Sequence, residues 1–177
     1  MTRSFETAEE ERTGLRKVRS IGGCVIHDTP PGTLAEVLES ASRGQMFEHA
    51  LSRFLIEFHT DPDAESRLRR IIDDPGLAPN PTLNVFLGAA GEHLARRWQL
   101  GEPPAWTDQP ERFSEEPRFM SPGIPEDQQR EESPTSFSRR LLYTRSEPLF
   151  LSPMTLSLYT FEMVELPEDH RGFGLRF

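Results

Sequence analysis

Apolar residues recur every three or four positions along four segments of the chain, as they do along the buried stripe of an amphipathic helix. These segments are residues 33–43, 46–58, 61–72 and 81–98. Thr33 with Glu36 three positions later matches a capping box, and Pro81 suits the first turn of a helix. The pattern therefore predicts four helices and a mainly α fold.

Residues 101–153, which we call the wrap, lack this helical period. Nine prolines fall within them, and each removes a backbone donor and biases the preceding residue towards extended geometry. Aromatic residues are nonetheless interspersed along the segment. We therefore predict an irregular wrap that packs on the helices through its aromatic side chains. Its most mobile part is expected at 123–133, and a short helix is expected to run from Ser133 towards Leu142.

Partial alternation of apolar and polar residues indicates strands near both ends of the chain. A short strand fits Val18–Ile26, another fits residues 155–166, and the final HRGFGLRF is either a second strand or a tail. The predicted fold is thus mainly α with short C-terminal strands, and α+β is the alternative. We expect three parts: a mobile N-terminal segment (1–30), a helical domain that includes the wrap (31–153), and a C-terminal extension (154–177) in which a β-hairpin can form.

Length and charge narrow the class of protein. The chain has 177 residues, which suits one domain, and a formal net charge of -9. Such an acidic chain repels phosphate backbones unless its cations gather on one face, so nucleic acid is a disfavoured partner. No segment approaches the roughly 18 apolar residues of a membrane span, and the first residues, MTRSFETAEEER, have neither the apolar core nor the cleavage signature expected of a signal peptide. We expect a cytoplasmic protein that does not enter membranes.

Local motifs for catalysis, phosphate binding and metal binding are missing from the sequence, including GxSxG, GxGxxG, HExxH and paired CxxC. We therefore predict no cofactor, no metal site and no catalytic residue, which means that the protein is not an enzyme. One alternative is an enzyme with a dispersed site around His93 or His49. Another is a regulator that contacts DNA through its arginine pairs, which are Arg69-Arg70, Arg96-Arg97 and Arg139-Arg140.

The wrap combines rigid prolines with Trp, Phe and Arg, the side chains that concentrate binding energy at interfaces. Packing against the core of the same chain is one interpretation of these residues, and contact with another protein is the other. The stretch from residue 108 to residue 132 contains eight acidic and three basic residues. This excess of negative charge would attract a basic partner. The candidates for partner contact are Trp106, Arg112, Phe113, Phe119, Arg139 and Arg140.

Residues 45–150 carry motifs in an order that resembles a loosely defined group of small, mostly uncharacterised bacterial proteins. The motifs are FEHALSRFLIEFHTDPD, IIDDPGL, NVFLGAAGEHLARRWQL, PPAWTDQPERFSEEPRF and ESPTSFSRRLLYTRSEPLF. Members of the group resemble antitoxins or accessory partners of nucleotidyltransferase-like toxins, and some carry a DNA-binding helix-turn-helix.

This resemblance implies a non-catalytic, protein-binding module whose partner is a basic toxin or a nucleotidyltransferase-like enzyme. Self-association into a homo-oligomer is compatible with it. The residues that the resemblance carries over to this chain, most of them in structural roles, are Glu92, His93, Trp106, Pro110, Arg112, Phe113, Phe137, Arg139 and Arg140.

Overall fold

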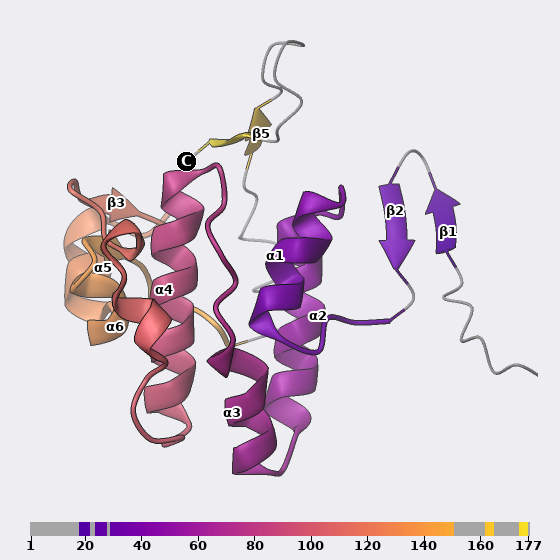
Figure 1. Cartoon of the computed structure of the whole chain (residues 1–177). Coiled ribbons are helices and arrows are strands. Elements are labelled where there is room, and N and C mark those ends of the chain that lie inside the picture. The colour runs from indigo at the N-terminus through magenta and orange to yellow at the C-terminus, as the bar shows by residue number, and fades with distance from the viewer. Residues whose placement is uncertain (1–17, 22–23, 28, 151–161, 165–173, 177) are drawn as a thin grey trace, which may run out of the picture.

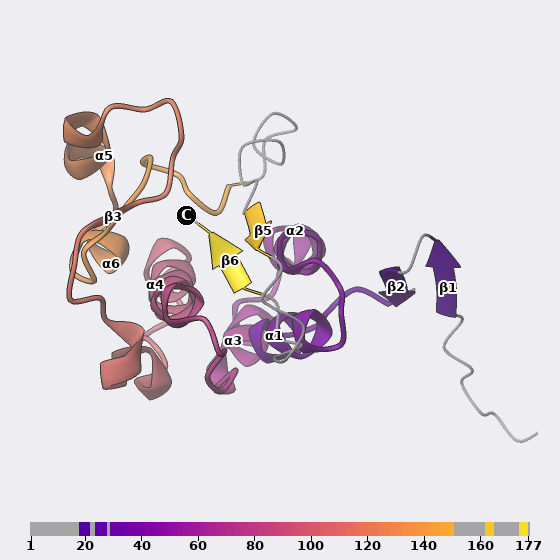
Figure 2. The ribbon, with the colours of Figure 1, turned by 90° about the horizontal axis from the view of Figure 1, so that it is seen from above.

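Four helices between residues 34 and 97 form the body of the computed structural model, which describes residues 18–21, 24–27, 29–150, 162–164 and 174–176 (Figure 1). In Figures 1 and 2, α4 lies between the other three helices on one side and the wrap on the other. The predicted helices are confirmed. They are α1 (Leu34–Ser42), α2 (Phe47–Thr60), α3 (Ala64–Ile72) and α4 (Pro81–Arg97).

Side-chain caps mark where three of these helices begin. Thr33 Oγ1 accepts a hydrogen bond from the amide of Glu36 at 3.1 Å, and Asp63 and Asn80 cap α3 and α4 in the same way. The carboxylate of Glu36 turns back and accepts from the amide of Gly32 at 2.7 Å. In a capping box it would bond the amide of the N-cap residue itself, so the predicted motif is shifted here by one residue.

The central helix, α4, is covered on all sides. Every residue from Thr82 to Ala95 is buried, whereas α2 buries a single stripe that includes Phe54 and Phe58. The spacing of apolar residues predicted one buried face for α4. Its other face carries small residues, and the wrap lies against them. At Gly91, a Cβ atom would stand 2.7 Å from the indole ring of Trp106, so only glycine allows this approach.

The wrap folds into short elements joined by turns. They are η1 (Ala105–Asp108), η2 (Pro110–Arg112), β3 (Arg118–Phe119), α5 (Glu126–Glu132), α6 (Thr135–Ser138) and β4 (Leu142–Tyr143). β3 pairs with β4 in parallel. The short helix expected after Ser133 is present as α6, although it ends well before Leu142, where β4 begins.

The segment expected to be the most mobile part of the wrap, residues 123–133, contains a helix that the sequence did not predict, α5 at Glu126–Glu132. α5 has no apolar stripe, and it is held by the buried side chain of Gln129. The amide group of Gln129 donates to the carbonyls of Ser121 and Ile124 at 3.0 and 2.8 Å. Its oxygen accepts from the amide of Ser121 at 3.0 Å. One polar side chain thus satisfies the backbone of the turn that precedes the helix.

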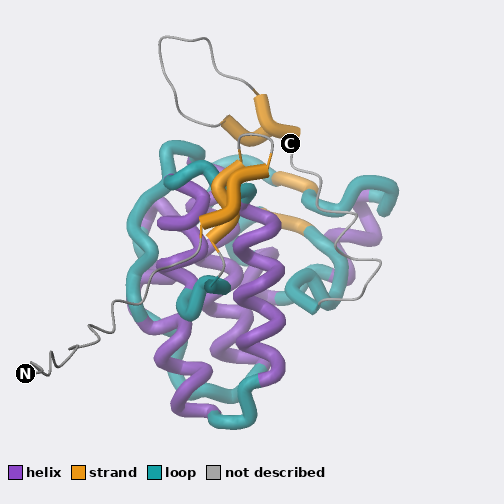
Figure 3. Tube along the Cα trace, turned by 90° about the vertical axis from the view of Figure 1, so that its right-hand side faces the viewer, coloured by secondary structure: helices purple, strands orange, loops and turns teal. Residues whose placement is uncertain are grey.

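Short antiparallel pairs of strands lie near the two ends of the chain. β1 (Val18–Ile21) pairs with β2 (Cys24–His27), and β5 (Glu162–Val164) pairs with β6 (Gly174–Arg176). Helices dominate the described chain, as Figure 3 shows, so the mainly α class is confirmed and the α+β alternative is not. Most of the predicted N-terminal segment and C-terminal extension lies outside the described residues. Within those that are described, no helix is both long and apolar enough to cross a membrane.

The contact between Gly91 and Trp106 gives a first prediction. Gly91→Ala should lower the free energy of unfolding by about 1 to 3 kcal/mol, because the added methyl group overlaps a buried ring. Helix propensity alone predicts the opposite sign. Urea unfolding followed by circular dichroism measures the change. Gly32→Ala is the control, since its Cβ would meet its nearest neighbour at an ordinary 3.5 Å. Equal stability of the two variants would contradict the close packing.

The turn between α2 and α3 gives a second prediction. Hydrogen bonds from the Ser66 hydroxyl, from the amide of Asp63 and from Arg70 lower the pKa of Asp61 to about 2. A carboxyl group whose pKa is lower in the folded state stabilises the fold above its unfolded pKa, here 3.8. That contribution is lost as the pH falls towards the folded value.

Asp61→Asn should therefore be less stable than the wild type at pH 7 and should lose less stability between pH 4 and pH 2. Urea unfolding at a series of pH values measures both effects. The control is Glu65→Gln. Glu65 also pairs with an arginine, Arg69, but its carboxylate is exposed. If both variants show the wild-type pH dependence, Asp61 is not its source.

Candidate functional site

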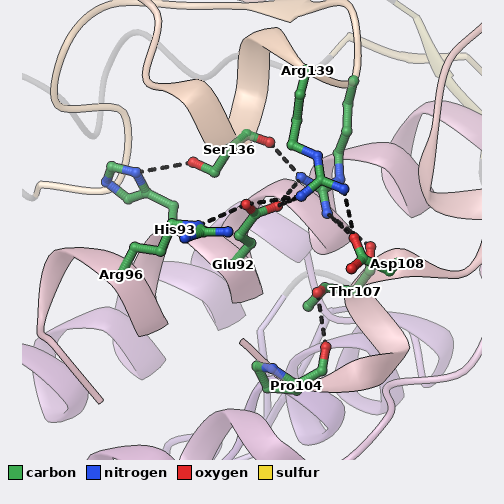
Figure 4. A network of polar contacts seen from close by, with 9 residues as sticks. Glu92, His93, Arg96, Pro104, Thr107, Asp108, Ser136 and Arg139 are labelled. Atoms are coloured by element: carbon green, nitrogen blue, oxygen red, sulfur yellow. Dashed lines mark hydrogen bonds and ion pairs between the residues drawn. The ribbon is translucent and has the colours of Figure 1, made fainter. Parts of the chain in front are cut away.

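A buried carboxylate on α4 anchors the wrap. Glu92 is 1% exposed and accepts hydrogen bonds from three arginines (Figure 4). Arg140 Nη1 donates to Oε2 at 2.5 Å, and Arg139 Nη1 donates to both oxygens at 3.1 and 3.2 Å. Arg96, one turn further along α4, donates through Nε at 2.8 Å. Two of the three cations come from the wrap, so this carboxylate joins the two parts of the fold.

Arg140 is completely buried and bonds in several directions. Its Nη1 also donates to the carbonyl of Ser136 at 2.6 Å, and its Nη2 donates to the carbonyl of Thr107 at 2.8 Å. Its Nε has no hydrogen-bond partner among the described residues, but its guanidinium lies 4.9 Å from the centre of the Phe113 ring. That ring face supplies a cation–π contact. Arg140 therefore fixes α6 and η1 to α4.

The electrostatics of this network favour the ionised carboxylate. Burial raises the pKa of Glu92, but the hydrogen bonds from Arg140 and Arg96 and the charges of Arg140 and Arg139 outweigh it. Its pKa consequently lies below the ordinary value of 4.5. Burial lowers the pKa of Arg140 against the opposing effect of Glu92, although a guanidinium still remains charged at neutral pH. Arg139 extends the network to the surface, where its Nη2 donates to Asp108 at 2.7 Å.

A second buried arginine holds the loop between α3 and α4. Arg112 is also fully buried, and its Nη2 donates to Asp74 at 2.9 Å and to the carbonyl of Gly76 at 2.8 Å. The indole Nε1 of Trp106 donates to the carbonyl of Ile71 at 3.1 Å. The guanidinium of Arg112 lies 5.0 Å from the centre of that indole ring. The wrap thus clasps the end of α3 as well as α4.

The structure divides the six predicted partner-contact residues into two groups. Trp106, Arg112 and Arg140 are 6%, 0% and 0% exposed, so these three side chains pack on the chain's own core. Phe113 and Phe119 are half-buried, and the side chain of Arg139 is 36% exposed. For these three residues, partner contact remains a prediction.

The sequence did not identify as site residues the carboxylates and carbonyls that accept hydrogen bonds from the arginines of the wrap. They include Asp74, Asp108 and Thr107, which lie between 31 and 38 residues away from the arginines that they contact. Glu92 is the exception, because the resemblance implied a role for it. A usable signal exists in the sequence: Glu92 is the single acidic residue within the small and apolar stretch of α4.

A small pocket adjoins the network near the C-terminal end of α4. Its volume is about 100 Å³, and it is lined by His59, His93, Leu94, Arg97, Trp98, Glu147, Leu149 and Phe150. His93 follows Glu92 directly, and its Nδ1 lies 3.3 Å from the hydroxyl of Ser136. Burial lowers the pKa of His93 below 6.5. Of the two histidines considered for a dispersed enzyme site, His93 therefore lines a pocket with one carboxylate, whereas His49 is exposed on α2.

The arginine pairs proposed for DNA contact are engaged with carboxylates. A guanidinium that already contacts a carboxylate offers less charge to a phosphate, so the structure gives no support to that alternative. The ion pairs are Arg69–Glu65, Arg70–Asp61, Arg96–Glu92, Arg97–Glu147, Arg139–Glu92 and Arg140–Glu92.

No protein-family model, no curated protein and no solved structure matches this chain. Across the described residues, no cluster of three or more His, Cys, Asp or Glu side chains is arranged to hold a metal ion. The fold and the site themselves define the class: a mainly α protein whose proline-rich wrap is fastened to a buried central helix by arginines and carboxylates.

The anchoring role of Glu92 gives a third prediction. Glu92→Gln should lower the free energy of unfolding by about 3 to 5 kcal/mol, because it leaves the buried Arg140 without its counter-charge. Since the folded pKa of Glu92 is depressed, the wild type should also lose stability as the pH falls through and below about 4.5, and the variant should lack this part of the loss.

Chemical unfolding at pH 7 and pH 3 measures both effects. Glu39→Gln, which removes an exposed carboxylate paired with Arg43, should change the stability by less than about 0.5 kcal/mol and serves as the control. Similar losses in the two variants would show that Glu92 has no special role.

Proposed function

We propose that this chain is a non-catalytic protein-binding module that contacts a basic partner through the outer face of the wrap. One observation carries the proposal: two arginines of the wrap are fully buried, whereas none of the carboxylates in its described residues is buried. Arg112 and Arg140 are buried against Asp74 and Glu92. The guanidinium of Arg130 lies over the stacked rings of Phe119 and Tyr143, 4.9 and 4.7 Å from the ring centres.

The acidic residues of the wrap remain at the surface. Seven of the eight between residues 108 and 132 are exposed, and of these seven only Asp108 pairs with an arginine in the described part of the chain. They are Asp108, Glu111, Glu115, Glu116, Glu126, Asp127 and Glu131. A surface with one sign of charge accelerates encounter with a partner of the opposite sign and disfavours other partners.

The wrap is also suited to binding because it is already held in place. Arg139, Arg140 and Trp106 attach it to α3 and α4, so little conformational freedom remains to be lost on association. The resemblance to antitoxins and accessory proteins suggests the partner class, a basic toxin or nucleotidyltransferase-like enzyme. Proteins that act on RNA or nucleotides present basic sites, which complement an acidic face. No cofactor and no catalytic residue enters this proposal.

The test is co-expression with the product of the neighbouring gene, followed by copurification at low salt. We expect a complex whose affinity falls as salt is raised. The triple variant Glu126→Lys, Asp127→Lys, Glu131→Lys on α5 should weaken the complex at least about tenfold, because it reverses three outward charges.

The matched control is Glu39→Lys, Glu57→Lys, Glu65→Lys, which makes the same change in net charge on exposed positions of α1, α2 and α3. It should retain most of the affinity. Equal losses in the two triple variants would show that net charge acts rather than the wrap. Failure to copurify, together with no rescue of any toxicity of the neighbouring product, would refute the proposed function.

A further inference from the structure

The pocket at the end of α4 has charges of both signs at its edge. Arg97 Nη2 lies 3.4 Å from Glu147 Oε1, and the two side chains are 57% and 49% exposed. The imidazoles of His93 and His59 line the interior, and burial keeps the pKa of His93 below its ordinary value. The lining therefore contains one guanidinium and one carboxylate beside two imidazole rings.

The remaining walls of the pocket are apolar. They are formed by Leu94 and Trp98 at the end of α4 and by Leu149 and Phe150 beyond the wrap's last strand. The His59 ring packs against this wall, 5.6 Å from the centre of the Trp98 ring, and its Nε2 contacts the carbonyl of Leu149 at 3.0 Å. A closed cavity of about 150 Å³ holds the six heavy atoms of a benzene ring, so the 100 Å³ here admits about four, and the charged groups of a larger ligand lie at the open edge beside Arg97 and Glu147.

We propose that this pocket binds a small zwitterion, an α-amino acid with a short side chain. Its carboxylate would bind the guanidinium of Arg97, its ammonium group would bind the carboxylate of Glu147, and its side chain would contact Leu94 and Phe150. The pocket does not depend on the outer face of the wrap, so this inference stands apart from the proposed function.

The balance of charge is what selects a zwitterion. A ligand with a single charge would be attracted by one of the two side chains and repelled by the other, because the charged atoms of Arg97 and Glu147 lie only 3.4 Å apart. A zwitterion replaces both halves of the existing ion pair at once. An ion pair between half-exposed side chains contributes little to stability, so it opens to admit such a ligand at small cost. The apolar walls then favour a ligand with an aliphatic group over water.

The probes are L-alanine and its two singly charged counterparts, propionate and ethylammonium, each titrated into the full-length protein. The readout is the imidazole signals of His93 and His59 in NMR spectra of isotopically labelled protein. We expect saturable shifts with L-alanine, with a Kd of about 1 mM for a ligand of this size. Propionate and ethylammonium should bind at least about tenfold more weakly.

Variants at the pocket edge make the test specific. Arg97→Gln and Glu147→Gln should each weaken L-alanine binding about tenfold, since each removes one of the two charges. Arg43→Gln is the matched control, because Arg43 also forms an ion pair, with Glu39, between side chains of similar exposure, but on α1. It should leave the affinity unchanged. Circular dichroism verifies that all three variants are folded.

Three results would overturn the inference. The first is the absence of saturable shifts with L-alanine at 20 times the expected Kd. The second is equal binding of propionate or ethylammonium, which would identify a simple ion site. The third is an equal effect of Arg43→Gln and Arg97→Gln, which would place the ligand elsewhere. None of these results bears on copurification with a basic partner, so the two proposals fail independently.

Discussion

The fold depends on one buried charge, the carboxylate of Glu92. An ionised group in the interior is tolerated only when cations and hydrogen-bond donors surround it, and here they come from distant parts of the sequence. Arg139 and Arg140 lie 47 and 48 residues further along the chain. The wrap lacks a continuous apolar face, so hydrophobic burial alone would allow it to settle on α4 in several ways. The carboxylate accepts these guanidiniums in one arrangement, and this fixes where the wrap lies.

Small residues on α4 make that arrangement sterically possible. A Cβ atom at Gly88 would stand 2.7 Å from the Cβ of Arg112 and 3.2 Å from the Nε of Arg140. Both buried arginines therefore cross the helix where it has no side chain. This also affects the surface, because the buried Arg112 and Arg140 add no exposed positive charge to the wrap, whereas most of its carboxylates are exposed. The interior network and the acidic outer face are two consequences of the same packing.

The sequence predicts the helices well because their information is local. A stripe with a period near 3.6 residues suffices for α1 to α3 and for the apolar side of α4, and capping residues mark the start of α1, α3 and α4. The failures have a common physical origin. α5 is held by hydrogen bonds between the side-chain amide of Gln129 and backbone groups. Such bonds require no periodic pattern of apolar residues in the sequence. The pairing of Glu92 with Arg140 is also non-local, since nothing near either residue specifies its partner. The sequence could name Glu92, Arg139 and Arg140, but not their contact.

Ser136 connects the network to the pocket. Its carbonyl accepts a hydrogen bond from Arg140, and its hydroxyl lies 3.3 Å from Nδ1 of His93, which lines the pocket. Any ligand that reorients the imidazole of His93 therefore acts on the residue that positions α6. α6 is also one of the elements through which Arg140 fastens the wrap to α4, so the pocket lining and the attachment of the wrap share Ser136. Linkage makes such an effect reciprocal: if an amino acid in the pocket altered the affinity for a basic partner, the partner would alter the affinity for the amino acid by the same factor.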